Sequence, residues 1–495
     1  RGELIDDFLD ARTAPLVGTQ VDSSWYCSCM AGQTFSHHTK LGGFYGKGIP
    51  QELVNRYGRD SLQIQTDFCH QNGIEAFWSL RMNDAHDSHP AGTRRWTYGL
   101  APFKRDHPEY MMGKPEDWDR YTDGLKRAWT HLDFGFQEVR EHILSVIQEV
   151  CQGYDIDGVE LDFLRSYPYF RETLEMLPVQ EEHISMMTDL VRKVRGLADE
   201  VSNTRGRPLL VAVRTPHTIV DARFIGLDLE TWLNEDLLDL FIPGGGTESH
   251  MTESFAGAVE LGHNHEIPVY PCIGWGFWNH WAYLDLSEER HPTHGEWLQS
   301  LRQEKTSHAI AINGWEGTMP SWRGGAANLL SAGADGVYTF NGFFAGPETW
   351  NEIGSMDTMA GRTKLFGVDM MDGESAIASS GDRRRKAVKP GAPLRAHFQV
   401  GEDPSGSTSL MFRLHLWELT AADDLRVALN GVSLDDLKPS VDLGAAPSGC
   451  WLETKVYDDL VRMGNNDVEL NLDRRNETLS SDLILDGVQL EMGFN

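Results

Sequence analysis

The sequence predicts an α/β protein, a (β/α)8 TIM barrel followed by a C-terminal β-sandwich. The chain has 495 residues, more than the roughly 250–300 at which a single core stops growing, so two domains are expected. Short apolar runs alternate with segments of helical period along roughly the first 370 residues, which is typical of repeated βα units. Only short alternating runs follow. We therefore expect a barrel over residues 1–380 and a sandwich over residues 388–495.

Eight segments are predicted to be barrel strands, because each is a short apolar run that ends in polar residues or glycine. They are Val17–Trp25, Ile74–Arg81, Ala128–Asp133, Gly158–Phe163, Leu209–Arg214, Leu238–Pro243, Pro268–Ile273 and Gly336–Phe340. Helices are predicted at Asp60–Asn72, Gln137–Gln152 and Glu182–Val201, and the second carries apolar residues at a spacing of three to four. Eight βα units make a barrel the simplest solution.

The C-terminal part contains short strands separated by turns rich in Gly, Asn, Asp and Pro. The predicted strands are Ala396–Val400, Leu410–Leu416, Leu425–Leu429, Val468–Leu472 and Leu483–Leu490. This pattern, without a helical period, is typical of a β-sandwich.

Charge and composition exclude several classes of partner. The chain has 44 Lys and Arg against 74 Asp and Glu, a net charge of 44 − 74 = −30, so we expect no nucleic acid and no anionic membrane as partner. No stretch approaches the roughly 20 apolar residues of a membrane helix. Because Arg1–Leu4 has neither region of a signal peptide, we expect a mature or trimmed product. The six cysteines are expected to be free thiols, although one disulfide is possible.

The segment Gly158–Phe163 carries two carboxylates at alternate positions. Since alternate strand residues face opposite ways, Glu160 and Asp162 should point into the barrel while the apolar residues between them face the helices. Asp162 is nearer the carboxyl end, where barrel enzymes build their active sites, and Glu160 lies one layer deeper. The alternative is a buried ion-pair network.

These residues belong to a longer motif. The run Leu132-Asp-Phe-Gly-Phe-Gln-Glu-Val-Arg, followed by Tyr154-Asp-Ile-Asp-Gly-Val-Glu-Leu-Asp-Phe-Leu-Arg165, resembles the glycoside-hydrolase-like family 10 barrels, whose pattern is "PEVR" and then "YDVDG-hydrophobic-x-x-D-x-x-R". Gln137 stands where that pattern has proline. The segment His107-Pro-Glu-Tyr resembles the family's "HPEW". A weaker similarity to family 18 chitinases fails at their catalytic Glu, where Leu164 stands.

The resemblance implies a carbohydrate-active enzyme, secreted or periplasmic, with Asp162 as a catalytic carboxylate. The sandwich is similar to galactose-binding-like or jelly-roll modules. Glycoside hydrolysis needs a second carboxyl group, and the best candidate is Glu248, directly after the sixth predicted strand; Glu316 is the rival. In a retaining mechanism Asp162 would attack the sugar, Glu248 would donate and then accept the proton, and Glu160 and Arg214 would orient Asp162.

Other polar and aromatic residues could line a sugar pocket. Sugar hydroxyls form hydrogen bonds with both donors and acceptors, and aromatic faces stack on pyranose rings. The substrate-binding candidates are Asp22, Asp84, His86, Glu160, Arg214, His217, Trp275, Trp278, Glu316 and Asn341. Arg214 could instead pair with Glu160 or Asp162, or it could hold the carboxylate or sulfate of an acidic sugar. The cluster at residues 83–87 could hold a metal, but no second cluster supports it, so no metal and no cofactor are expected.

Two other functions remain open. One is a non-catalytic carbohydrate-binding barrel that has lost one carboxyl group. The other is a polysaccharide lyase in which His86 or His217 removes a proton next to a uronate carboxylate held by Arg214.

Overall fold

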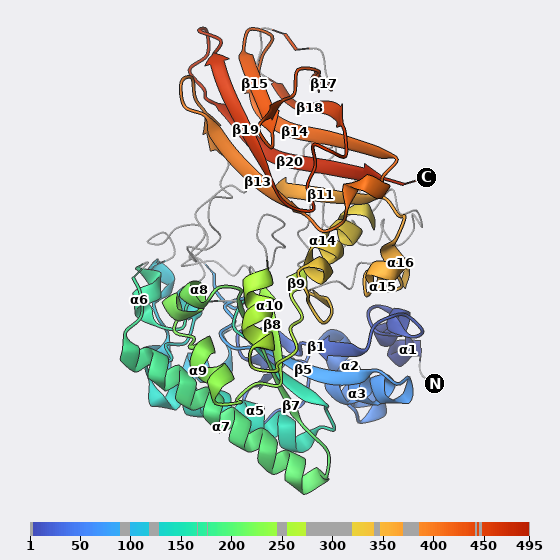
Figure 1. Cartoon of the computed structure of the whole chain (residues 1–495). Helices are drawn as coiled ribbons and strands as arrows, with labels where there is room; N and C mark the ends of the chain where they lie inside the picture. The colour runs from blue at the N-terminus through green and yellow to red at the C-terminus, as the bar shows by residue number, and fades with distance from the viewer. Residues whose placement is uncertain are drawn as a thin grey trace. The chain divides into compact units, whose positions relative to one another are not determined.

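The computed structural model (Figure 1) describes residues 3–89, 100–117, 128–165, 167–175, 177–244, 255–273, 319–340, 347–369, 386–440, 443–444 and 448–494. They form two compact units. The first unit contains residues 3–244 and 257–271, apart from the gaps just given. The second contains residues 255–256, 272–273, 319–340, 347–369 and 386–494, again apart from those gaps. The predicted boundary near residue 380 therefore remains a prediction.

A parallel sheet forms the centre of the first unit. Its strand order is β1 (Ser23–Tyr26), β5 (Glu75–Arg81), β6 (Gly158–Asp162), β7 (Leu210–Pro216) and β8 (Leu240–Gly244), and every neighbouring pair is parallel. These strands occupy five of the predicted positions. Within the described residues they make a half-barrel, so the closed (β/α)8 barrel remains a prediction.

The strand predicted at Ala128–Asp133 is wrong. Residues Ala128–Thr130 form a short 3-10 helix, and Leu132 makes only an isolated bridge to Met111. The Asn83 side chain explains this, because its Oδ1 accepts from the backbone N–H of Leu132 and its Nδ2 donates to the Leu132 carbonyl, at 2.9 Å each. The backbone groups that a strand would pair are thus occupied by a side chain.

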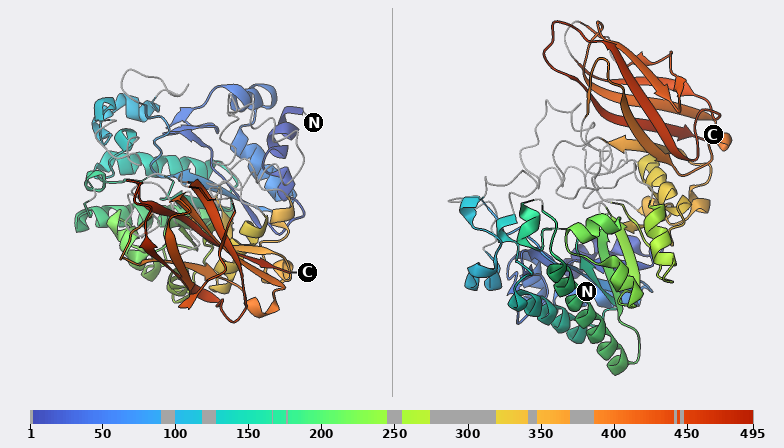
Figure 2. Two further views of the ribbon diagram at one scale, coloured as in Figure 1. Left: turned by 90° about the horizontal axis from the view of Figure 1, so that it is seen from above. Right: turned by 60° about the vertical axis from the view of Figure 1, so that its left-hand side comes forward.

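Helices cover the sheet and join its strands. They are α1 (Glu3–Asp10), α2 (Gly48–Tyr57), α3 (Ser61–Gln71), α4 (Pro102–Asp106), α5 (Gln137–Gly153), α6 (Arg171–Leu174), α7 (Glu181–Arg205), α8 (Ile219–Phe224), α9 (Leu229–Asn234) and α10 (Ala256–His263). The three predicted helices are confirmed as α3, α5 and α7. α3 contacts β1 and β5, α7 contacts β7, and the long helices α5 and α7 run side by side (Figures 1 and 2). A small separate sheet contains β2 (Cys29–Ala31), β3 (Thr34–Phe35) and β4 (Gly43–Phe44).

The second unit begins with the parallel pair β9 (Cys272–Ile273) and β10 (Tyr338–Thr339), which confirms two more predicted strands. Its helices are α14 (Met319–Ser331), α15 (Pro347–Trp350) and α16 (Met356–Met359). α14 lies tightly on the strands that follow, since a Cβ at Gly324 would collide with the backbone of Leu365. Among the helices of the described residues, none is both long enough and apolar enough to cross a membrane.

Two antiparallel sheets make up the rest of the second unit. One contains β11 (Lys364–Asp369), β12 (Lys386–Val388), β14 (Ser409–Leu419), β17 (Lys438–Pro439), β18 (Ser448–Val456) and β20 (Leu483–Gly493). The other contains β13 (Leu394–Val400), β15 (Asp424–Leu429), β16 (Val432–Ser433) and β19 (Gly464–Arg474). All five predicted C-terminal segments are strands. Phe398 of one sheet lies 6.4 Å from Phe412 of the other, between ring centroids, which supports the predicted sandwich.

Candidate active site

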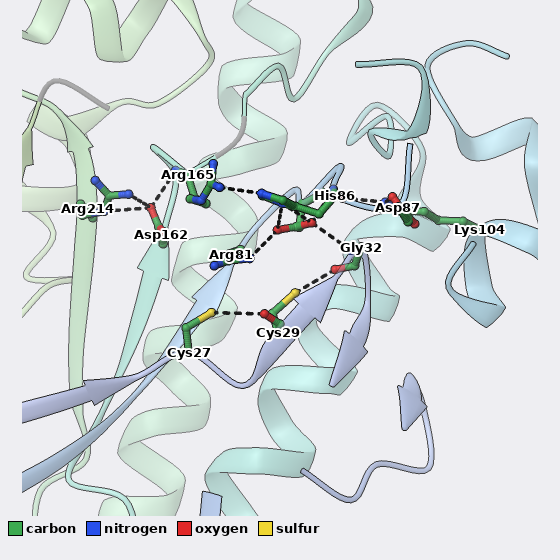
Figure 3. Close-up of polar contacts among 11 residues, drawn as sticks. Cys27, Cys29, Gly32, Arg81, His86, Asp87, Lys104, Asp162, Arg165 and Arg214 are labelled. Atoms are coloured by element: carbon green, nitrogen blue, oxygen red, sulfur yellow. Dashed lines mark hydrogen bonds and ion pairs between the residues drawn. The ribbon is translucent and has the colours of Figure 1, made fainter. Parts of the chain in front are cut away.

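Three charged residues lie in register at the carboxyl ends of neighbouring parallel strands. Arg81 of β5 is paired with Asp162 of β6, and Asp162 is paired with Arg214 of β7. Residues paired in this way project from the same face of a sheet. Figure 3 shows their side chains converging, and Asp162 and Arg214 are buried. The position of Asp162 at this end of the strand agrees with the prediction.

One oxygen of the Asp162 carboxylate is held by several donors. Oδ1 accepts from the backbone N–H groups of Leu164 at 3.0 Å and Arg165 at 2.9 Å, and from Nε of Arg214 at 3.0 Å. Nη2 of Arg214 lies 2.9 Å from the same oxygen. No hydrogen bond from the described part of the chain reaches Oδ2. The carboxylate is therefore fixed in orientation through one oxygen, and the other receives no hydrogen bond from these residues.

Arg214 lies level with Asp162 in the sheet, and Glu160 lies deeper. Arg214 pairs with Asp162, so of the two roles that we considered for Arg214, the ion pair is the one observed. Glu160 is fully buried and lies two residues before Asp162 on β6, one layer deeper, as the strand pattern predicts. Arg214 contacts Asp162 directly, whereas the role of Glu160 in orienting Asp162 remains a prediction.

A second carboxylate, Asp84, organises the segment after β5. Its Oδ1 accepts the backbone N–H groups of Gly32 at 2.9 Å and His86 at 2.7 Å, and Nη1 of Arg81 lies 3.0 Å from its Oδ2. Burial raises the pKa of Asp84, but the hydrogen bond from His86 and the charges of Arg81 and Arg165 outweigh this, so the pKa lies well below its usual value. Asp84 is therefore an ionised buried group and the anchor of this segment.

His86 links Asp84 to Arg165. Its Nδ1 lies 2.8–2.9 Å from the two oxygens of Asp84, and its Nε2 lies 2.6 Å from Nη2 of Arg165 (Figure 3). A guanidinium can only donate, so Nε2 must accept, and Nδ1 carries the proton that Asp84 receives. This arrangement defines a neutral histidine of known tautomer beside Asp162.

Sequence reasoning missed several residues of the site. Lys104 is fully buried, donates to the backbone carbonyl of Asp84 at 2.7 Å and pairs with Asp87 at 3.1 Å. Nothing in the local sequence marks Lys104, which lies on the short helix α4 between β5 and β6. Arg81 could have been found, since it ends a predicted strand as Asp162 does. Asn83, a member of the cluster that we considered for a metal, instead forms hydrogen bonds with both backbone groups of Leu132.

Histidine, cysteine and acidic side chains can also form metal-binding or reactive-thiol sites. Within the described residues no group of three or more His, Cys, Asp or Glu side chains is arranged to hold a metal ion. All six cysteines are free thiols, as expected. Cys29 donates to the carbonyl of Gly32 at 2.9 Å, and burial raises its pKa well above the usual value, so the thiol remains protonated.

The other predicted site residues have different outcomes. Asp22 is exposed and immediately precedes β1, at the amino end of the sheet, so it does not join Asp162; the first strand begins six residues later than predicted. His217 directly follows β7 at the carboxyl end and is half-buried. The remaining candidates, Glu248, Trp275, Trp278, Glu316 and Asn341, lie outside the described residues.

Comparisons with known proteins give weak similarities. No protein-family model and no curated protein matches the chain. Among solved structures, the chain is similar to chitinase ChiW of Paenibacillus sp. str. FPU-7, with 12% identity, TM-score 0.40, and 97% of this chain and 42% of that one covered. It is similar to the family 36 α-galactosidase AgaB of Geobacillus stearothermophilus, with 12% identity, TM-score 0.35 and coverages of 99% and 53%.

A family 18 N-acetylglucosaminidase of Paenibacillus barengoltzii is also similar, with 12% identity, TM-score 0.31 and coverages of 57% and 83%. The chain thus spans about half the length of the two larger proteins. With similarity this low, the chemistry of the site has to be argued from its own geometry.

Proposed function

We propose that this protein is a glycoside hydrolase that cleaves poly- or oligosaccharides at the carboxyl edge of its parallel sheet. The observation that carries the proposal is the Asp162 carboxylate, buried at that edge and held through Oδ1 by two backbone N–H groups and Arg214. A carboxylate oriented in this way is what a glycosidase needs at the anomeric carbon. The motif that resembles glycoside-hydrolase-like family 10 barrels includes Asp162 and supports the same chemistry.

In the retaining version of this proposal, Oδ2 of Asp162 attacks the anomeric carbon while Glu248 protonates the departing oxygen. A bond forms between the sugar and Asp162 as the glycosidic bond breaks. Glu248 then takes a proton from water, which attacks the same carbon and releases Asp162. Arg214 and Glu160 act as positioning residues. The tryptophans at 275 and 278, with His217, Glu316 and Asn341, are proposed to contact the sugar.

A lyase is the second candidate, with His86 as the base. Its Nε2 is an acceptor, as a general base must be, but Arg165 donates to it at 2.6 Å, so that contact has to break before Nε2 can take a proton. In that reaction the base takes the proton next to a uronate carboxylate, a carbon–carbon double bond forms, and the bond to the leaving oxygen breaks. The unsaturated product absorbs ultraviolet light, whereas a hydrolysis product does not.

The test is reducing-end release by the wild type and Asp162→Asn across neutral, uronate-containing and sulfated polysaccharides. We expect the variant to lose roughly 10³-fold or more of the activity, because the nucleophile is gone. Asp106→Asn, which removes an exposed carboxylate paired with Arg105, is the matched control. Near-ultraviolet circular dichroism checks the fold of both variants. If folded Asp162→Asn released reducing ends as fast as the wild type, the proposal would be wrong. Binding of a polysaccharide by the wild type without any product would indicate the non-catalytic function.

The anomeric form of the first product tests the retaining mechanism. Proton NMR of the fresh digest should show the configuration of the substrate if Asp162 forms a covalent intermediate. An inverted product would mean that Asp162 activates water instead.

A further inference from the structure

The cations of the candidate site are paired with carboxylates, with one exception. The pairs are Arg81 with Asp84, Lys104 with Asp87, and Arg214 with Asp162. Arg165 lies among them (Figure 3) but forms no ion pair with any carboxylate of the described residues. Among the described residues, Arg165 is therefore the cation of this site that has no carboxylate partner.

The Arg165 side chain makes few contacts within the described residues, and its only hydrogen bond there is to an uncharged ring. Its Nη2 donates to the neutral ring of His86 at 2.6 Å, and its Nε is buried without a hydrogen-bond partner. Its backbone N–H donates to Asp162 Oδ1 at 2.9 Å. The residue whose backbone N–H holds the candidate nucleophile thus also carries this guanidinium. Most of the five N–H donors of the guanidinium have no hydrogen-bond partner among the described residues.

Such an arrangement costs energy in the free protein. A guanidinium remains charged at neutral pH, and a largely buried charge needs a counter-ion or several hydrogen bonds. Burial and the neighbouring charge of Arg81 lower the pKa of Arg165 to about 10. At neutral pH the side chain is still a cation. An anion placed against it would relieve the cost of burial and would use the planar fork for two parallel hydrogen bonds.

We propose that Arg165 binds the carboxylate or sulfate group of an acidic sugar that lies next to Asp162, so that the substrate is an anionic glycan. This inference rests on the proposed function for the position of the sugar. The unpaired guanidinium and its buried, unpartnered Nε carry it. The net charge of −30 does not oppose it, because salt screens charges more than about 8–10 Å away, whereas Arg165 would touch its ligand.

The first experiment measures binding by calorimetry, with glucuronate, glucose 6-sulfate and glucose as probes. The wild type should bind at least one charged sugar about tenfold or more tightly than glucose, and Arg165→Gln should lose that difference. Gln is uncharged and shorter than Arg, so it removes both the charge and the planar fork. Arg165→Lys, which keeps the charge but loses the fork, should be intermediate. Arg171→Gln is the matched control, since Arg171 is half exposed and paired with Asp133.

The second experiment uses polymers in matched pairs: polygalacturonate with its carboxyl-reduced form, and a sulfated galactan with its desulfated form. Cleavage of a charged member only, lost in Arg165→Gln, supports the inference and distinguishes carboxylate from sulfate. Equal or better cleavage of a neutral member by the wild type overturns the inference and leaves the proposed function standing. If no polymer is cleaved, the proposed function fails and the calorimetry decides: tighter binding of a charged sugar that depends on Arg165 supports the anion site, and its absence overturns it.

Discussion

Among single residues, Asp84 collects the densest set of charge-assisted contacts in the candidate site. It is fully buried and receives two backbone N–H groups, the ring of His86 and the guanidinium of Arg81. Removing one member of a buried ion pair leaves the other uncompensated. We expect Asp84→Asn to lower the free energy of unfolding at pH 7 by about 3–5 kcal/mol in urea titrations. Asp106→Asn, at an exposed pair, should leave the urea midpoint unchanged.

The same carboxylate should make stability depend on pH in acid. The pKa of Asp84 is lowered by folding, so its contribution is present above the unfolded-state pKa of about 4 and is lost as the pH falls toward the folded-state value. The unfolding free energy of the wild type should therefore fall below about pH 5, and Asp84→Asn should show a shallower fall. Parallel curves for the two proteins would contradict this role.

The stability of the protein should also depend on pH through a buried base, His131. Burial lowers its pKa to about 3, and neither ring nitrogen has a hydrogen-bond partner. Below about pH 6.5, His131 is protonated in the unfolded chain but stays neutral in the folded protein. The free energy of unfolding therefore falls as the pH falls from 6.5 toward 3. We expect His131→Leu to remove roughly 2 kcal/mol of the loss between pH 7.5 and pH 5. His397→Leu, on the exposed face of β13, is the control.

The residues that sequence reasoning could place are those at the ends of strands. Asp162, Glu160 and Arg214 follow from strand periodicity, because alternation alone decides which side chains share a face. Arg165 was visible in the motif but had no assigned role. Lys104 reaches Asp84 from an insertion, and no local pattern predicts a contact across 20 positions.

At the level of elements, the pairing of β5 with β6 depends on a glycine. Gly158 lies opposite Phe77, and a Cβ at this position would collide with the Phe77 ring. That ring cannot easily move, because it is buried and stacks on Trp25 with centroids 4.1 Å apart. We expect Gly158→Ala to cost about 1–3 kcal/mol in urea titrations.

The control for this prediction is Gly153→Ala, at the end of α5. Nothing lies within 4 Å of a Cβ there, so the change should be small. Phe77→Leu introduced together with Gly158→Ala should recover part of the lost stability, since the smaller side chain removes the collision. Additive losses in the double variant would contradict this explanation.

Helices and strands were predicted well where the spacing of apolar residues is regular. They were predicted poorly where a side chain takes the hydrogen bonds that a neighbouring strand would otherwise make. The buried core of β6 and the apolar face of α5 confirm the first case. The failed strand at Ala128–Asp133 is the second: its residues are apolar enough for a strand, but Asn83 takes the hydrogen bonds of Leu132. A contact from a residue 49 positions away cannot be read from the local sequence.

At the scale of the whole molecule, the second unit contains more than the predicted sandwich. α14 lies on β11 and β13: Asn328 donates to the carbonyl of Gln399 at 3.3 Å, and a Cβ at Gly401 would collide with the backbone of Ala327. Lys364 of β11 is buried and pairs with Glu402 at 2.6 Å. These contacts join residues before 380 to residues after it within the second unit.

A pair of fragments tests which boundary is the folding boundary. We expect residues 319–495 to unfold cooperatively in urea, because that fragment keeps α14, β11 and both antiparallel sheets. Residues 388–495 alone would lose β11, which pairs with β20 from Lys364 to Asp369, and would expose the edge of a strand that is otherwise buried. An uncovered edge of this kind favours aggregation. Size-exclusion chromatography should therefore show the shorter fragment to be associated or unfolded. A monomeric, cooperative 388–495 fragment as stable as the longer one would instead mean that the sandwich is complete without α14 and β11.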